Sequence, residues 1–213
     1  MYFVKAPWWL KKLYSNCIWQ IDTAEKIIYL TFDDGPHPQA TAFVLDELKK
    51  YNAQATFFCI GKNVADYPLI YKRIIEEGHA VGNHTQHHLN GWKTNDTAYI
   101  KDIRLAKELI DSNLFRPPYG KISRFQLSLL QSLSLNLHTI MWSVLSGDFD
   151  IHLSKEKCAD NVLKNTGKGS IVVFHDSEKA FERMQFALPR VLAFFNEKNF
   201  RFQKLSSKNV TKR

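Results

Sequence analysis

KIIYLTFDDGP, residues 26–36, is the stretch of sequence that decides how this chain folds. Its first part, Lys26–Phe32, is rich in β-branched and aromatic residues, which predicts a buried strand, and Asp-Asp-Gly-Pro predicts a turn after it. A second run of the same kind, Ser170–His175, predicts another buried strand. Both strands end in groups that can carry chemistry, two carboxylates in one case and an imidazole in the other.

Strand-like and helix-like segments alternate through the rest of the chain. We expect further extended segments at 56–60, 79–83, 137–142 and 200–204, and helices at 39–51, 67–77, 97–112, 123–134, 156–165 and 183–196. Such alternation predicts parallel strands joined by right-handed crossovers. An open doubly wound sheet and a barrel of about seven strands both fit, and the pattern slightly favours the barrel.

Composition limits the class of protein. The chain has 213 residues, of which 45% are hydrophobic, which predicts one globular domain and excludes disordered and collagen-like classes. Its three cysteines, Cys17, Cys59 and Cys158, are far apart and lack CxxC spacing. This spacing argues against a disulfide scaffold and against a thiolate zinc site.

The net charge of +8 favours acidic partners, but the basic residues are scattered and indicate a solvated surface. With no nucleic-acid recognition module, we expect no nucleic-acid partner. No stretch approaches the ~18 apolar residues of a membrane span, so we expect no transmembrane segment. Residues 1–18 lack the apolar run and cleavage site of a signal peptide, which leaves localisation open, with the cytoplasm as the default expectation.

Asp33 and Asp34 are adjacent carboxylates at a strand end. Two such groups repel each other and lose solvation there, so a cation that neutralises them would be favourable. The alternative interpretation is a pair of ordinary turn residues before Gly-Pro.

Three histidines lie in the segment 84–88, HTQHH. On a helical turn, His84 and His88 would project from one face at a spacing that suits two nitrogen ligands of one zinc ion. His87 lies three residues after His84 and would also meet it, so the spacing leaves the pair open. Surface histidines without a ligand role are the alternative.

The loop 116–120, RPPYG, is rigid because its two prolines fix φ and remove two donors. A rigid Tyr119 N–H would suit an oxyanion, although a structural turn explains the same residues. His175 ends the most apolar strand, where a packed core histidine is the alternative. Between them, residues 141–150, MWSVLSGDFD, offer Trp142 as a wall and Asp148 as a carboxylate partner.

Together these motifs resemble the polysaccharide deacetylase family, the NodB-homology carbohydrate esterases. Residues 31–36 match the family's first motif, TFDDGP, in full, and 84–88 match its second, H-[ST]-x-x-H, which selects His84 and His88 over His87. Residues 116–120 match the third, R-x-P-Y-G, and 173–175, VFH, stand where the fifth belongs. The resemblance covers residues 26–204.

The fourth motif departs from the family pattern. In place of the usual Asp-x-x-Asp-Trp, residues 145–149 read LSGDF, so Leu145 replaces the first Asp and Phe149 replaces the Trp. Only the second Asp, Asp148, is kept, and it is our candidate for the group that tunes the catalytic histidine. The exchange of Trp for Phe149 is expected to alter a substrate subsite.

The resemblance implies an α/β fold, a distorted (β/α) barrel, and one divalent ion held by Asp34, His84 and His88. Zn²⁺ is the expected ion, with Co²⁺, Ni²⁺ and Mn²⁺ as alternatives. The implied nucleophile is a water bound to that metal, with Asp33 as its general base. The other implied roles belong to His175, the general acid, Arg116, which orients Asp33, and Tyr119, Pro118 and Trp142, which form the substrate and oxyanion side.

The implied reaction removes N-acetyl groups from a polysaccharide that contains N-acetylglucosamine, peptidoglycan or chitin-like. An O-acetyl xylan esterase or a non-sugar amide hydrolase of the same fold is the nearest alternative. A non-catalytic carbohydrate-binding protein is a second, but its signature would be loss of Asp33, His84, His88 or His175, and all are present.

The expected domain organisation has three parts. Residues 1–25 form a short element packed on the domain, 26–205 the catalytic domain, and 206–213 a basic tail. The exposed or buried state of Trp8, Trp9 and Trp92 bears on substrate binding, and for each we expect packing rather than stacking on a sugar ring. The oligomeric state is not readable from the sequence.

Overall fold

A computed structural model of the chain describes residues 2–132 and 135–210. Parallel strands form one curled sheet in the order β5-β4-β3-β2-β1-β7-β6, and β8 pairs with β1 beside this path. The strands are β1 (Ile27–Asp33), β2 (Thr56–Cys59), β3 (Ala80–Asn83), β4 (Leu114–Phe115), β5 (His138–Thr139), β6 (Val144–Leu145), β7 (Ile171–His175) and β8 (Arg201–Phe202). The expected distorted barrel of parallel strands is confirmed.

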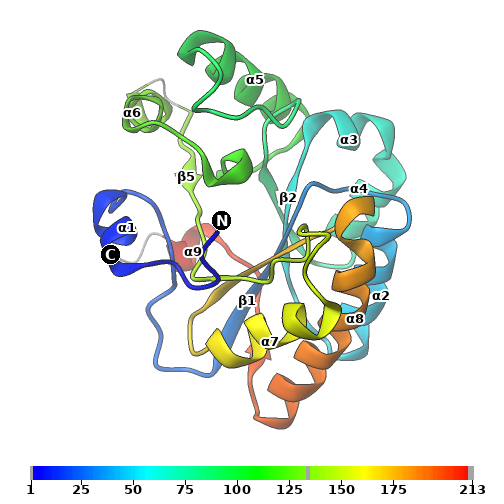
Figure 1. The fold of residues 1–213 in the computed structure, drawn as a ribbon. Helices are drawn as coiled ribbons and strands as arrows, with labels where there is room; N and C mark the ends of the chain where they lie inside the picture. The colour runs from blue at the N-terminus through cyan, green and yellow to red at the C-terminus, as the bar shows by residue number, and fades with distance from the viewer. Residues whose placement is uncertain (1, 133–134, 211–213) are drawn as a thin grey trace.

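Most of the helices lie around the outside of this sheet, whereas α9 (Ser207–Val210) lies nearer the middle of the molecule (Figure 1). The others are α1 (Trp8–Leu13), α2 (Ala40–Lys50), α3 (Gly61–Asp66), α4 (Pro68–Glu76), α5 (Asp96–Leu109), α6 (Arg124–Ser132), α7 (Lys155–Asn165) and α8 (Glu178–Glu197), with a 3₁₀ turn, η1 (Pro118–Gly120). Figure 1 shows α2, α4 and α8 along one side of the sheet, and α1 on the opposite side.

The central strand β1 is buried along its whole length and divides its residues between two environments. Ile28, Leu30 and Phe32 belong to the apolar cluster beneath α2, α7 and α8. Ile27 and Tyr29 belong to a different cluster, inside the curl of the sheet. Because side chains alternate along a strand, Thr31 and Asp33 continue this inner row toward the carboxyl end, where the functional groups gather.

The N-terminal segment hydrogen-bonds both edges of the open sheet. The Leu145 N–H on edge strand β6 donates to the carbonyl of Val4 at 2.8 Å. The Ile18 N–H donates to the carbonyl of Thr139 on the other edge strand, β5, at 2.9 Å. These two hydrogen bonds pair backbone groups that the edge strands would otherwise leave free. The N-terminal segment thereby closes the side on which the barrel lacks a strand.

Several elements differ from the expected ones because they are too short to show a period. Helix α3 has six residues, and β4 and β6 have two each. Helix α8 begins at Glu178 rather than Arg183, and its first turn already packs on the core through the buried Ala180 and through Phe181. The expected helix at 123–134 corresponds to α6 over its described part, Arg124–Ser132, and residues 133–134 lie outside the described residues, as do 211–213 of the expected basic tail.

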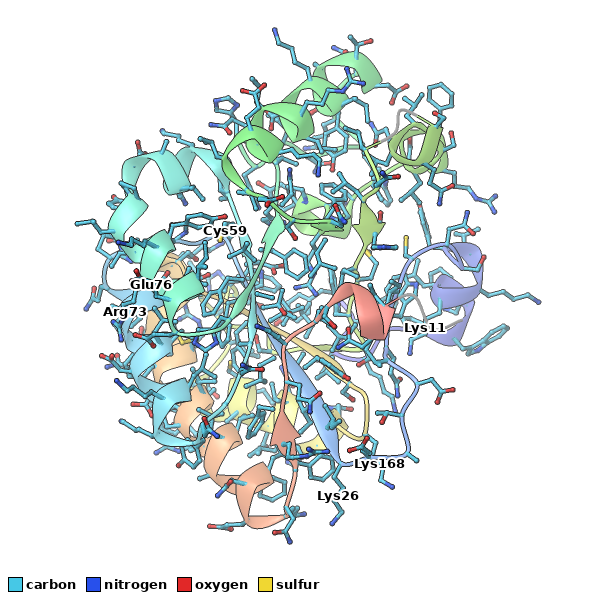
Figure 2. All side chains as sticks on the ribbon, turned by 180° about the vertical axis from the view of Figure 1, so that it is seen from behind. Lys11, Lys26, Cys59, Arg73, Glu76 and Lys168 are labelled. Atoms are coloured by element: carbon cyan, nitrogen blue, oxygen red, sulfur yellow. The ribbon has the colours of Figure 1, made fainter. Side chains whose placement is uncertain are left out.

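The basic residues labelled in Figure 2 lie on different sides of the molecule. Lys11 lies on α1, Arg73 lies across the molecule on α4, and Lys26 and Lys168 lie at the end from which β1 and β7 start. This distribution agrees with a solvated basic surface. Within residues 2–132 and 135–210, no helix combines the length and the apolar character that a membrane crossing requires.

Gly169 offers a test of how the N-terminal segment is fastened to the barrel. It has φ +71°, its carbonyl accepts the Ile21 N–H at 2.9 Å, and a Cβ placed on it would lie 1.9 Å from the carbonyl oxygen of Ile21. We expect Gly169→Ala to lower the free energy of unfolding by about 2 kcal/mol or more, measured by urea denaturation. Gly167→Ala is the matched control, because a Cβ there meets nothing within 4 Å; equal stability of the two variants would contradict the prediction.

Candidate active site

Asp34, His84 and His88 converge at the carboxyl end of the sheet. Asp34 follows β1, and the two histidines lie in the loop after β3. The Oδ1 atom of Asp34 lies 3.6 Å from Nε2 of His84 and 3.1 Å from Nε2 of His88. The three ligand atoms all lie within 4.8 Å of one another. The residues proposed from the family motifs as a metal site are therefore brought together.

The expected helical turn at 84–88 is wrong. The segment is an irregular loop in which Thr85 has φ +63° and His88 has φ +56°. These two left-handed residues reverse the chain, so His84 and His88 meet through loop geometry rather than through the spacing of a helix. Nothing in the sequence marks either residue as left-handed, since neither is Gly.

Asp102 on α5 explains why His87 is not part of the cluster. Its Oδ1 lies 2.7 Å from Nδ1 of His87, and its Oδ2 accepts the backbone N–H groups of Gln86 and His87 at 2.9 and 3.0 Å. His87 is thus held by a carboxylate outside the cluster, and the same carboxylate fixes the loop that carries His84 and His88. The sequence spacing left this choice open, and the contact with Asp102 decides it.

The orientation of His84 suits a metal ligand. Its Nδ1 lies 2.7 Å from the backbone carbonyl of Arg116. A carbonyl oxygen only accepts, so Nδ1 carries a proton, and Nε2 is the ring nitrogen that faces Asp34. A second hydrogen bond of this kind is usual for histidines that bind metals.

The carboxylate of Asp34 fits a bound cation. Its Oδ1 is buried and accepts no hydrogen bond from any described residue, an arrangement that is unfavourable without a positive partner. Burial raises the pKa of Asp34, but the imidazoles of His84 and His88 outweigh burial and hold that pKa well below its usual range. One carboxylate and two imidazoles form a donor set that divalent transition metals accept.

Asp33 is paired with a fully buried arginine. Nη1 of Arg116 donates to Oδ1 of Asp33 at 2.7 Å and to Oγ1 of Thr31 at 2.7 Å. Its Nε and Nη2 donate to the backbone carbonyls of Ile140 and Met141 at 3.1 and 2.9 Å. Burial lowers the pKa of Arg116 and Asp33 partly restores it. The guanidinium therefore fixes one oxygen of Asp33 and leaves the other toward the cavity.

His175, at the end of β7, is held by both oxygens of Asp148. Its backbone N–H donates to Oδ2 at 2.7 Å, and its Nδ1 lies 2.8 Å from Oδ1. Burial lowers the pKa of His175, but the charge and hydrogen bond of Asp148 outweigh it and raise that pKa to about 9. The pair has the form of an imidazole oriented by a buried carboxylate, with Nε2 free to face a substrate.

The altered fourth motif forms part of the wall beside His175. The ring of Phe149 lies 5.1 Å from the ring of His175 and 5.0 Å from the ring of Tyr2, measured between centroids. Tyr2 donates its hydroxyl to Oδ2 of Asp150 at 3.2 Å. The N-terminal segment therefore supports this wall, while Leu145 lines the cavity as an apolar side chain.

The RPPYG loop gives the cavity an aromatic side. The Tyr119 ring lies 4.6 Å from the ring of His88, and Tyr119 has φ +59°. Gly120 has φ +64°, and a Cβ on it would lie 2.5 Å from Cη2 of Trp142, so glycine permits the close approach of that indole. Pro118 is buried and is not among the residues that line the cavity.

Asp176 is a residue of the site region that the motifs did not assign. Its Oδ1 accepts the Gly35 N–H at 3.1 Å, and its Oδ2 accepts the Thr41 hydroxyl at 2.5 Å. A Cβ on Gly35 would lie 2.1 Å from that carboxylate. Burial raises the pKa of Asp176 to about 7. It fixes the loop just after Asp34, and the available signal was an acidic residue directly after His175 at a strand end.

One cavity of about 530 Å³ unites these groups. Asp33, Asp34, His84, His88 and His175 all line it, together with Tyr119 and Trp142. Arg116 and Asp148 lie behind this lining and are fully buried. The cavity thus brings two carboxylates and three imidazoles together within one concave, partly aromatic site.

Comparison with known proteins identifies the class. The sequence profile of the polysaccharide deacetylase family matches residues 20–138. A peptidoglycan-N-acetylglucosamine deacetylase of Bacillus cereus is 34% identical, with 88% of this chain and 90% of that protein covered. A chitooligosaccharide deacetylase of Azorhizobium caulinodans is 34% identical over 74% of this chain and 77% of its own length.

The solved structures agree. The crystal structure of the Bc1960 peptidoglycan N-acetylglucosamine deacetylase superposes with a TM-score of 0.84 at 32% identity, covering 94% of this chain and 95% of that one. The fold and site thus define a hydrolase of the deacetylase class. This chain belongs to the polysaccharide deacetylase family.

The pairing of His175 with Asp148 can be tested without substrate. Asp148→Asn removes the charge that opposes burial, so the pKa of His175 should fall from about 9 to 6.5 or below, measured by NMR titration of the imidazole. In the wild type, the raised pKa contributes stability below about pH 6.5 that is lost as the pH rises through 9. Asp150→Asn is the control, because Asp150 lies in the same loop but contacts Tyr2 rather than His175. A pKa of His175 that stays near 9 in Asp148→Asn would refute the assignment.

Proposed function

We propose that this chain removes acetyl groups from N-acetylglucosamine units of a polysaccharide, peptidoglycan or chitin-like, with the help of one divalent cation. The observation that carries the proposal is the single cavity in which Asp33, the triad of Asp34, His84 and His88, and His175 meet. The substrates in the names of the relatives support the choice of acetyl acceptor.

Asp34, His84 and His88 would hold the cation, and Zn²⁺ suits this donor set, with Co²⁺, Ni²⁺ and Mn²⁺ as alternatives. A cation bound there would act as a Lewis acid that polarises the acetamide carbonyl and makes water more acidic. Asp102 and the carbonyl of Arg116 keep the two histidines in place for it.

Asp33 is the proposed general base. Arg116 occupies its Oδ1, so Oδ2 is the atom that accepts a proton from the water attacking the acetyl carbonyl. The fixed hydrogen bond keeps the carboxylate in one orientation, which lowers the entropic cost of reaching the reactive geometry. The Tyr119 N–H is the proposed donor to the oxyanion that forms as water adds.

His175 is the proposed general acid. An amide nitrogen leaves poorly unless it is protonated, and acid–base help contributes about 10²–10⁴-fold to such steps. The imidazolium held by Asp148 gives its proton to the sugar nitrogen as the C–N bond breaks. The products are acetate and the sugar amine in its protonated form, since the proton of the acetic acid passes to the amine, and the proton taken by Asp33 balances the one given by His175.

The direct test is acetate release. The purified protein, loaded with Zn²⁺, is incubated with N-acetylglucosamine oligomers, with peptidoglycan and with acetylated xylan. We expect acetate from the first two. Acetate from acetylated xylan alone would mean that the protein hydrolyses O-acetyl esters rather than N-acetyl amides. No acetate from any of the three substrates would overturn the proposal.

Variants distinguish the proposed role of Asp33 from that of the two histidines, His84 and His88. Asp33→Asn should retain the cation but lose about 10²–10⁴-fold in kcat, whereas His84→Ala and His88→Ala should lose the cation, measured by calorimetric Zn²⁺ titration. His87→Ala is the matched control, because its ring contacts Asp102 rather than Asp34. Loss of Zn²⁺ binding in His87→Ala equal to that in His88→Ala would contradict the assignment.

The rate should fall as the pH rises through the pKa of His175, because the general acid must be protonated. That pKa is raised to about 9 in the cation-free protein. A bound cation offsets the contribution of the nearby carboxylates, so the basic limb of kcat/KM should lie at or below pH 9. Asp148→Asn should move the limb to lower pH, and a limb that does not move would exclude His175 as the acid.

A further inference from the structure

The outward face of α1 and the residues before it carry exposed apolar side chains. The expected packing of Trp8 and Trp9 is wrong, because they are 76% and 48% exposed, and Phe3 and Leu13 are 54% and 46% exposed. The ring centroids of Phe3 and Trp9 lie 6.3 Å apart, and Trp9 and Leu13, four residues apart, share one face of the helix. We call these four side chains the α1 patch. It lies at the edge of the molecule in both views (Figures 1 and 2).

The barrel holds α1 through the opposite face of the helix. Leu10 and Tyr14 pack against the apolar cluster that contains Trp19. The hydroxyl of Tyr14 also donates to the carbonyl of Ile122 at 3.2 Å. The α1 patch is therefore not needed to keep the helix in place. Large apolar side chains that gather on a surface without a role in folding usually mark an interaction site.

Trp92 is exposed as well, but it does not belong to this patch. Its expected packing is wrong, since its side chain is 60% exposed. Its Nε1 nevertheless donates to the carbonyl of Ile122 at 3.1 Å, and Nζ of Lys121 lies 4.5 Å from its ring centroid. By contrast, Nε1 of Trp8 and of Trp9 donates to none of the described residues, so both indole N–H groups can reach an outside acceptor.

Three lysines border the α1 patch. Lys11 and Lys12 lie on α1 itself, Lys5 lies just before it, and residues 1–21 contain no Asp or Glu. The lysines that form ion pairs within the described part of the chain are others. Burial lowers the pKa of Lys11, and the charge of Lys5 lowers it further. The segment therefore carries positive charges without counter-ions of its own, which an anionic partner would stabilise.

We propose that the α1 patch and its three lysines bind the surface of a lipid bilayer that contains anionic phospholipids. Tryptophan side chains favour the boundary between headgroups and acyl chains, and lysines beside them reach the lipid phosphates. The inference does not rest on the proposed function, because it concerns a different surface of the molecule. Tyr2 of the same segment lines the catalytic cavity, so lipid binding would hold that cavity close to the bilayer.

Two other partners fit this surface less well. In a symmetric dimer the same patch meets itself, which would bring the unpaired lysines of two copies together. A stable protein interface also takes about 20–30 residues from each side, many more than the α1 patch offers. A soluble polyanion would engage the lysines but leave the tryptophans in water. An anionic bilayer is the partner that uses both the apolar and the basic side chains.

The test is sedimentation of the purified chain with sucrose-loaded vesicles. One set of vesicles contains phosphatidylcholine with phosphatidylglycerol, and the other contains phosphatidylcholine alone. Trp8→Ala is matched with Leu69→Ala, because Leu69 is 79% exposed on α4, across the molecule. Lys12→Gln is matched with Lys49→Gln on α2, another exposed lysine. Urea denaturation checks that each variant is folded.

We expect the wild type to sediment with the anionic vesicles and only weakly with phosphatidylcholine alone. Trp8→Ala should weaken binding about tenfold, because an apolar side chain no longer enters the bilayer. Lys12→Gln should weaken it about fivefold, since one attraction to the anionic surface is lost. Leu69→Ala and Lys49→Gln should bind as the wild type does, and added NaCl should weaken binding in every case.

Three results would overturn the inference. The first is no sedimentation of the wild type with anionic vesicles, and the second is an equal loss of binding in the α1 variants and their matched controls. The third is binding that falls in Lys12→Gln but not in Trp8→Ala, which would indicate attraction to any polyanion. Light scattering that shows a dimer lost in Trp8→Ala would assign the patch to a second copy and also overturn it.

Discussion

The buried ion pair between Arg116 and Asp33 is the interaction on which the rest of the site depends. The guanidinium is out of contact with water and uses its donors on β1, through Thr31 and Asp33, and on the backbone after β5. Its own carbonyl fixes His84. One side chain therefore joins Asp33, the histidine loop and the far edge of the sheet. Removing it would leave a buried carboxylate without a partner, which typically costs about 3–5 kcal/mol.

Buried side chains behind the cavity wall fix the positions of the residues that line the cavity. Asp148 holds His175, Asp102 holds the histidine loop, and Asp176 holds the turn after Asp34. The loop of Asp148 is in turn held by Arg183 on α8, whose Nε donates to the Asp148 carbonyl at 2.6 Å. Each of these cavity segments is thus positioned by a buried partner on a different element, which is how preorganised sites keep their geometry.

The sequence predicted the parallel barrel and the residues that meet in the cavity, because apolar strands followed by polar residues and complete motifs are local signals. It did not predict the route by which His84 and His88 meet, since that depends on left-handed backbone at Thr85 and His88. It also did not predict the exclusion of His87, which depends on Asp102 from α5, fifteen residues away in the sequence. The exposure of Trp92 was missed for the same reason: packing of an aromatic side chain is decided by segments distant in the chain.

The docking of the N-terminal segment has a consequence for how the molecule reaches its working form. Tyr2 contacts Asp150 across 148 residues of sequence, and the strand that Val4 pairs with is among the last parts of the sheet to be synthesised. Contacts so far apart carry a large loop-closure entropy and form late. The N-terminal segment can dock only once β6 and the loop that follows it are in place, so the wall beside His175 is completed late in folding.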